Sequence, residues 1–100
     1  MLVVLEWMEE AEKRGIPHED VSHAMTEGRL WFVPKFEESR IPGEPDPSLF
    51  VGCARDGVTM LEVMVTPREP NTLVVFHVME ARSKHVDLAR RKSIARRKEK

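Results

Sequence analysis

The chain has 100 residues, of which 41% are hydrophobic and 33% charged, with a formal net charge of −1. This size and balance predict a single small domain over residues 1–100, and they exclude a disordered chain or one with two hydrophobic cores. The only cysteine, Cys53, excludes an intrachain disulfide and a cysteine zinc cluster, so a reducing cytoplasm is expected. Because a small domain buries a limited share of its surface, a homodimer or a hetero-oligomer could contribute to its stability.

The first 28 residues predict a strand followed by two short helices. The segment Leu2–Trp7 is β-branched and aromatic, as is typical of a strand, and it is too short for a signal sequence or a membrane span. We therefore expect no association with a membrane. A first helix is predicted over Met8–Arg14, with Gly15 as its left-handed cap. Pro17 suits the first turn of a second helix, which should end at Gly28.

Residues 30–81 predict a sheet. Pro34 cannot donate a ladder hydrogen bond, so the strand before it should lie at an edge. The polar segment Glu37–Pro47 contains three prolines and no hydrophobic periodicity, which predicts a flexible Pro-rich loop. Asp56-Gly57 between two apolar runs is a strong signal for a hairpin. The expected strands are Leu30–Val33, Leu49–Arg55, Val58–Val65 and Thr72–Ala81, the last three forming an antiparallel meander.

The C-terminal segment differs from the rest of the chain in its charge. Residues 83–100 carry a charge of about +6 and the remaining residues about −7. A narrow apolar stripe of Val86, Ala89 and Ile94 predicts a basic helix, and residues 90–100 are expected to form a tail that frays toward its end. This tail could bind phosphates, contact an acidic partner or remain solvated.

The order of these elements predicts an α+β fold. We expect a small antiparallel sheet, a β-meander, packed with two short N-terminal helices and a basic C-terminal helix. The helices are expected to cover one face of the sheet.

His77 lies in the longest predicted strand. Strand alternation would place it on one face with Val75 and Met79, and would place Glu80 and Arg82 on the other face. A lone histidine among aliphatic side chains is either a neutral, hydrogen-bonded core imidazole or a catalytic or substrate-binding group, and a metal ligand is a third option. The alternation therefore argues against one cluster that unites His77 with Glu80 and Arg82.

Glu62 interrupts an apolar strand and faces the same way as Met60 and Met64. It lies either on the solvent face or in a partly buried position with a raised pKa, and the second setting would suit general acid–base catalysis. The turn expected at Pro67–Asn71 permits a register that places Glu62 opposite or diagonal to His77, although a slip of one residue would undo this pairing. His18 and His23 lie off one helix face, and no zinc-ligand spacing or phosphate loop is present, so we expect no metal and no cofactor.

Four segments of the chain together resemble the BrnT-type toxins of the RelE superfamily. They are Leu5-Glu6-Trp7, GIPHEDVSHAM at residues 15–25, PDPSLFVGCARDGVTMLEV at 45–63 and VVFHVMEARSK at 74–84. This resemblance implies a compact RelE-like α+β fold and an endoribonuclease that cleaves mRNA. It also implies a type II toxin–antitoxin system, in which a cognate antitoxin protein binds and neutralises the toxin.

The resemblance assigns roles to individual basic residues. The arginine of the Val-Gly motif falls on Arg55, although Cys53 and Ala54 are inserted before it, and the arginine of the Ala-Arg ending falls on Arg82. Arg82 would act in catalysis, and the candidates for binding the RNA phosphates are Arg55, Lys84, His85, Arg90 and Arg91. The acid or base would be His77, His85 or Glu62, with His77 first. The alternative is a non-catalytic module that binds a protein or a nucleic acid through the same fold and tail.

Overall fold

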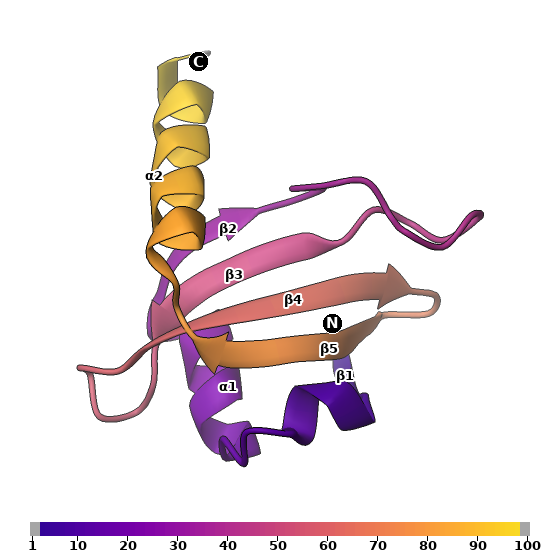
Figure 1. Cartoon of the computed structure of the whole chain (residues 1–100), viewed down its shortest axis with the longest axis horizontal. Helices are drawn as coiled ribbons and strands as arrows, with labels where there is room; N and C mark the ends of the chain where they lie inside the picture. Colours follow the sequence, from indigo (N-terminus) through magenta and orange to yellow (C-terminus); the bar gives the residue numbers. More distant parts are fainter. Residues whose placement is uncertain (1–2, 99–100) are drawn as a thin grey trace.

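The structure is a computed structural model that describes the backbone of residues 3–98 and the side chains of residues 3–92. Five strands form one sheet in the order β1-β5-β4-β3-β2 (Figure 1). The α+β class predicted from the sequence is confirmed. The elements are β1 (Val4–Trp7), the 3-10 helix η1 (Glu9–Glu12), α1 (His18–Met25), β2 (Arg29–Val33), β3 (Ser48–Cys53), β4 (Met60–Arg68), β5 (Thr72–Glu80) and α2 (Ser83–Lys98).

The sheet is mixed, which corrects the expectation of a purely antiparallel sheet. β2, β3, β4 and β5 pair in antiparallel fashion, but β1 runs parallel to β5 and forms the opposite edge from β2. The parallel pair places Val4 beside Thr72 and Trp7 beside Val75. Because these partners are far apart in sequence, local signals could not reveal their pairing. The Asp56-Gly57 turn does join β3 and β4 as predicted, with Gly57 at a φ of 72°.

The first expected helix is only a 3-10 turn, so the described chain has two α-helices. Its backbone bonds span three residues, as from the Ala11 amide to the Met8 carbonyl at 2.9 Å. Ala11 is the only buried residue of η1, and a single buried side chain cannot support an amphipathic helix. Gly15 ends this turn with a φ of 66°, in the left-handed region that glycine adopts without strain.

The helices cover both faces of the sheet, which corrects the expectation that they lie on one face. One core cluster joins Val21 and Ala24 of α1 and Ala11 of η1 to Val63 and other strand residues. A second cluster joins Ala89 of α2 to residues of the opposite face, Val33, Leu49, Val51 and Met64. We call these the α1 face and the α2 face. Alternate residues of β3 divide between the two, so its positions are buried on both sides.

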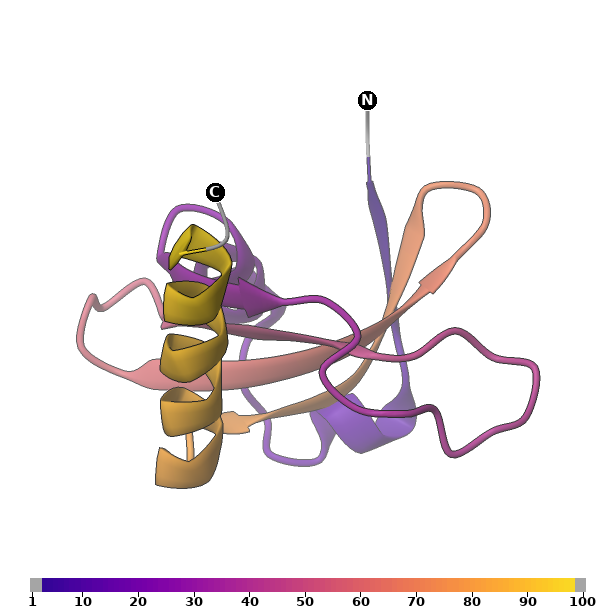
Figure 2. The ribbon, with the colours of Figure 1, turned by 90° about the horizontal axis from the view of Figure 1, so that it is seen from above.

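The loop between β2 and β3 lies on the α2 face. Figure 2 shows this loop and α2 on the same side of the sheet, and both contribute to one groove. The segment Glu37–Pro47 forms neither a helix nor a strand, but it is tied at both ends. The Phe36 amide donates to the Pro47 carbonyl at 3.0 Å, and the Ser39 amide donates to the Asp46 carboxylate at 2.8 Å.

The basic C-terminal segment is helical as far as the structure describes it. α2 continues to Lys98, so residues 90–98 extend the helix. The expected frayed tail covers residues 90–100, of which Glu99 and Lys100 lie outside the described residues. The side chain of Ile94, expected in the apolar stripe, also lies outside the described part.

The fold depends on a close approach between α1 and β3 at Gly52. A Cβ atom at this position would lie 2.1 Å from the carbonyl oxygen of Ala24 and 2.7 Å from that of Gly28. Backbone atoms cannot move aside as a flexible side chain can. We predict that Gly52→Ala lowers the free energy of unfolding by about 3 kcal/mol, measured by urea denaturation.

Val58→Ala provides the matched control, because Val58 is 83% exposed in the turn that follows β3. It should change the free energy of unfolding by less than about 0.5 kcal/mol. An equal effect of the two substitutions would contradict the close packing at Gly52.

Candidate active site around Glu62

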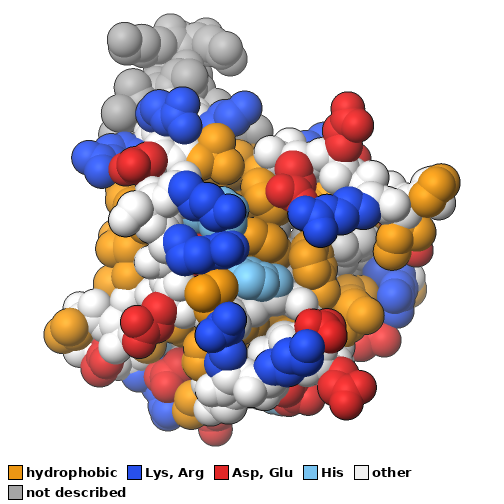
Figure 3. Space-filling model, in the orientation of Figure 1, with side chains coloured by type: hydrophobic (Ala, Val, Ile, Leu, Met, Phe, Trp, Pro, Cys, Tyr) orange, Lys and Arg blue, Asp and Glu red, His pale blue; other side chains and the backbone are white. Residues whose placement is uncertain are grey.

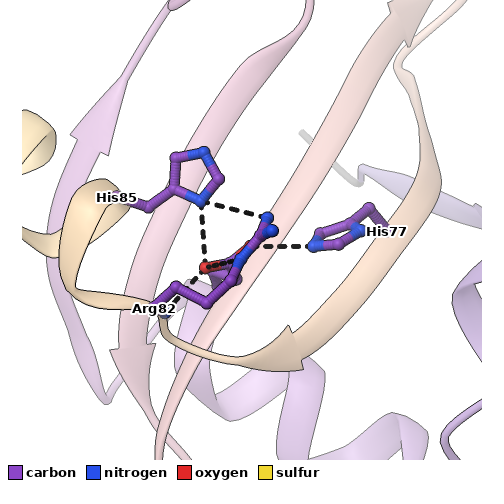
Figure 4. A network of polar contacts seen from close by, with 4 residues as sticks. His77, Arg82 and His85 are labelled. Carbon is purple, nitrogen blue, oxygen red and sulfur yellow. Dashed lines mark hydrogen bonds and ion pairs between the residues drawn. The ribbon is translucent and has the colours of Figure 1, made fainter.

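Glu62 is a carboxylate buried within the sheet. It lies on β4 between Met60 and Met64, on the α2 face, and its side chain has 0% exposed surface. Isolated charges are rarely buried in this way, because removal from water costs several kcal/mol unless hydrogen bonds replace the lost hydration. Three residues from the end of β5 and the start of α2 provide those bonds: His77, Arg82 and His85 (Figure 4). The four residues together are called the Glu62 cluster.

Each carboxylate oxygen of Glu62 accepts two short hydrogen bonds. Oε2 accepts from Nε2 of His77 at 2.8 Å and from Nη2 of Arg82 at 2.7 Å. Oε1 accepts from the backbone amide of Arg82 at 2.8 Å and from Nδ1 of His85 at 3.0 Å. The carboxylate is therefore satisfied on both oxygens, and one of its donors is fixed main chain.

These contacts determine which nitrogen of each imidazole carries the proton. A carboxylate only accepts hydrogen bonds, so Nε2 of His77 and Nδ1 of His85 must be the donors. The 3.3 Å contact between Nη2 of Arg82 and Nδ1 of His85 is then an approach of two donors that share Glu62. Nδ1 of His77 and Nε2 of His85 have no hydrogen-bond partner among the described side chains, and neither is sealed from solvent.

Glu62 is ionised at neutral pH. Burial raises the pKa of Glu62, but the hydrogen bonds from His77, from Arg82 and from His85 together outweigh that effect and hold the pKa well below its ordinary value. The sequence leaves two settings open for Glu62, the solvent face or a partly buried position with a raised pKa, and the structure shows neither, because the side chain is fully buried and its pKa is lowered. A carboxyl group with a lowered pKa holds donors in place and does not deliver protons near neutral pH.

A β-bulge places His77 beside Glu62. Met64 pairs with His77 and Val65 pairs with Val75, so Phe76 is the extra residue on β5. Val75 therefore faces the α1 core, whereas Phe76 and His77 both contribute to the α2 face. The strict alternation expected from the sequence is wrong here, and so is the separation of His77 from Arg82. The resulting register leaves Glu62 diagonal to His77, as one of the expected registers allowed.

Arg82 and His85 reach Glu62 because α2 begins there. The carbonyl oxygen of Arg82 accepts the amides of His85 at 3.0 Å and Val86 at 3.1 Å, which makes Arg82 the residue that opens the helix. Residues three apart lie on one side of a helix, so the side chains of Arg82 and His85 approach the same carboxylate. Glu62 thus attaches the start of α2 to the sheet.

A groove of about 660 Å³ opens beside the Glu62 cluster. Met64 and Phe76 contribute apolar surface to it, and Phe36, at the start of the loop, packs edge-on against the His85 ring with a centroid separation of 6.2 Å. Figure 3 shows Lys and Arg side chains next to histidine on this side of the molecule. The charged residues that line the groove are Glu10 of η1, Glu37, Glu38, Arg40 and Glu44 of the loop, Arg68 of β4, and Arg82 and Lys84 beside α2.

Three of the expected phosphate-binding residues lie away from this groove. Nε of Arg55 pairs with Asp20 of α1 at 2.7 Å, on the other face of the sheet. Arg90 contacts Asp87 of the same helix at 3.4 Å. Arg91 is exposed on α2 and does not line the groove. Of the expected site residues, the structure therefore brings together His77, Arg82, Glu62 and His85, with Lys84 at the rim.

Sequence reasoning missed the residues that the loop and the neighbouring strands add to the groove. Arg40 and Ile41 reach it from the loop, and Phe76 reaches it through the bulge. Phe76 stands in an apolar run, where an aromatic side chain is typical of the core, so its residue type alone did not indicate the groove. No local pattern indicates that the loop turns back over β4 and β5.

The described residues provide neither a metal-binding cluster nor a helix that could cross a membrane. Among the side chains of residues 3–92, no group of three or more His, Cys, Asp or Glu is placed to hold a metal ion. Within residues 3–98, no helix combines the length and the apolar character needed to cross a membrane.

The Glu62 cluster leads to a prediction about stability. Glu62→Gln removes the charge and places an amide N–H₂ among donors, so it should lower the free energy of unfolding by about 3–5 kcal/mol at pH 7. Urea denaturation measures the change. Glu80→Gln, an exposed neighbour at the end of β5, is the matched control and should change it by less than about 0.5 kcal/mol.

The free energy of unfolding of wild type and that of Glu62→Gln should also depend differently on pH. Because the folded-state pKa of Glu62 is lowered, its stabilising effect is complete above the unfolded-state value, about 4.3, and is lost as pH falls toward the folded-state value. The stability difference between wild type and Glu62→Gln should therefore shrink between about pH 5 and pH 3. A constant difference across this range would show that Glu62 is not held as an ion.

No family model, curated protein or solved structure matches the chain. The resemblance to the BrnT-type toxins therefore stays a prediction from the sequence. The function must be inferred from the geometry of the Glu62 cluster and the groove beside it.

Proposed function

We propose that this chain is a BrnT/RelE-like endoribonuclease toxin that cleaves mRNA and is neutralised by a cognate antitoxin. The observation that carries the proposal is the hydrogen bond by which Glu62 fixes the imidazole of His77. Its Nε2 is fixed on a buried, ionised Glu62, while its Nδ1 has no hydrogen-bond partner among the described side chains and the residue lines the groove. A histidine whose tautomer and orientation are fixed by a carboxylate is suited to move a proton from a substrate hydroxyl.

Arg82 and Lys84 would supply the positive charge in this proposal. The guanidinium uses Nε and Nη2 on Glu62, and its side chain remains 40% exposed beside the groove. Its outer edge and the exposed ammonium of Lys84 could bind a phosphate and stabilise the charge that develops during cleavage. Glu62 itself has no exposed surface, so in the proposal it is a positioning residue and not the acid or base.

The coarse fold is compatible with the RelE-like type. An antiparallel run of strands leads directly into a basic helix, and the Glu62 cluster lies at that junction, where the resemblance puts its Ala-Arg motif. An antitoxin that covered the groove would neutralise the protein by excluding RNA. The cytoplasmic location and the assembly with an antitoxin are parts of this same proposal.

A second candidate is a non-catalytic module that binds a protein or a nucleic acid. The ion pair between Arg82 and Glu62 favours it, because an arginine held by a buried carboxylate is also what a purely structural tie between α2 and the sheet would require. In this case exposed basic residues of α2, such as Arg91, would provide the binding surface.

The two candidates differ in what His77→Gln should do. The glutamine amide can still donate to Glu62 from a position close to Nε2, but it cannot take up a proton. We therefore predict that mRNA cleavage falls about 10²- to 10⁴-fold while the melting temperature stays within about 3 °C of wild type. Gel analysis of a labelled transcript and thermal denaturation measure the two quantities.

Arg14→Ala is the control for a substitution outside the groove, since Arg14 is exposed in the turn after η1 and does not line the groove. Its cleavage rate should match that of wild type. Absence of cleavage by the wild-type protein would overturn the nuclease proposal and favour the binding module. Unchanged cleavage by His77→Gln would remove His77 from the reaction.

A further inference from the structure

Two histidines of the Glu62 cluster share one carboxylate in an almost symmetrical way. His77 uses Nε2 on one oxygen and His85 uses Nδ1 on the other, at 2.8 and 3.0 Å. Each ring thereby keeps its second nitrogen unpaired among the described side chains, and both rings line the same groove. Figure 4 shows the two rings on opposite sides of the Arg82 side chain.

This arrangement matches the requirements of RNA cleavage by an internal hydroxyl. In such a reaction the nucleophile and the leaving oxygen lie on opposite sides of the phosphorus, so one group must take a proton on one side and another must give a proton on the other side. A cation between them would hold the phosphate. The guanidinium between the two imidazoles lies where that cation is needed.

We propose that His77 and His85 act as an acid–base pair of opposite roles, a conclusion that rests on the proposed nuclease function. One neutral imidazole takes the proton of the 2′-hydroxyl, and O2′ forms a bond to phosphorus. The bond from phosphorus to the 5′ oxygen breaks, and the other imidazole, protonated at the start, gives its proton to that oxygen. The products are a 2′,3′-cyclic phosphate end and a 5′-hydroxyl end.

The proposal defines the substrate by its chemistry. The attacking group is the 2′-hydroxyl, so a strand with deoxyribose at the cleavage position cannot react. The reaction consumes no water and needs no further reactant, because the nucleophile belongs to the substrate. One protonated and one neutral imidazole are required together, which gives the cleavage rate a maximum at an intermediate pH.

Other charged groups act on the same pair from every neighbouring element. Glu62 is a negative charge in contact with both rings, and Arg82 and Lys84 are positive charges beside them. The remaining charged residues of the groove, on the other elements around it, are Glu10 of η1, Arg68 of β4, and Glu37, Glu38, Arg40 and Glu44 of the loop. The pH optimum therefore reports the whole groove, while the loss of one limb on substitution reports a single histidine.

The decisive experiment compares two RNA substrates of the same sequence. One has the natural 5′ oxygen at the cleavage position, and the other has sulfur there, a leaving group that departs without a proton. His77→Gln and His85→Asn are the matched variants, because each amide can replace the nitrogen that donates to Glu62. His18→Gln, on α1 and outside the groove, is the control histidine.

With the natural substrate, both variants should cleave about 10²- to 10⁴-fold more slowly than wild type, and each should lose one limb of the pH profile. With the sulfur substrate, the variant that lacks the acid should regain a rate near that of wild type, while the other stays slow. The control should match wild type on both. The wild-type products should carry 2′,3′-cyclic phosphate and 5′-hydroxyl ends.

Each failure has a different meaning. If wild type cleaves RNA but His85→Asn cleaves as fast, or if sulfur rescues both variants or neither, the acid–base pair is wrong and the nuclease proposal stands. Ends other than a cyclic phosphate would also overturn the pair alone. If wild type cleaves neither substrate, the nuclease proposal and the pair both fall.

Discussion

The buried carboxylate of Glu62 is the constraint on which this end of the molecule depends. An ion without exposed surface is stable only where donors replace its lost hydration, and here these come from the end of β5 and the start of α2. Satisfying Glu62 therefore fixes the exit of the last strand and the first turn of the helix. The apolar contacts of α2, such as Ala89 in the second core cluster, then continue an orientation set at the cluster.

The bulge at Phe76 allows one strand, β5, to contribute side chains both to the first core cluster and to the groove on the opposite face. On the α1 side, Val75 and Val78 stay buried in the first core cluster, although two residues separate them. Without the extra residue, His77 would share a face with Val75 and could not reach Glu62. One inserted residue therefore brings an aromatic ring and an imidazole to the same side, which alternation would forbid.

Short-range features could be predicted from the sequence, and long-range ones could not. The Asp56-Gly57 hairpin and the edge strand before Pro34 follow from backbone preferences of a few residues. Three features depend on partners far along the chain: the parallel pairing of β1, the bulge in β5, and the face of the sheet on which α2 packs. The same holds at Glu62, whose donors lie 15 to 23 residues further on, so neither of the two settings expected from the sequence is a fully buried ion with a lowered pKa.

Arg82 links the stability of this cluster to its proposed chemistry. Because its charge is matched by Glu62, the cluster with two neutral imidazoles has no net charge, and Lys84 is a further cation at the rim of the groove. A phosphate entering the groove would gain the outer edge of the guanidinium but little free positive charge. Protonation of one imidazole supplies that missing charge. In the proposed reaction, the proton needed by the leaving oxygen thus also helps to hold the phosphate, so binding and catalysis would depend on the same proton.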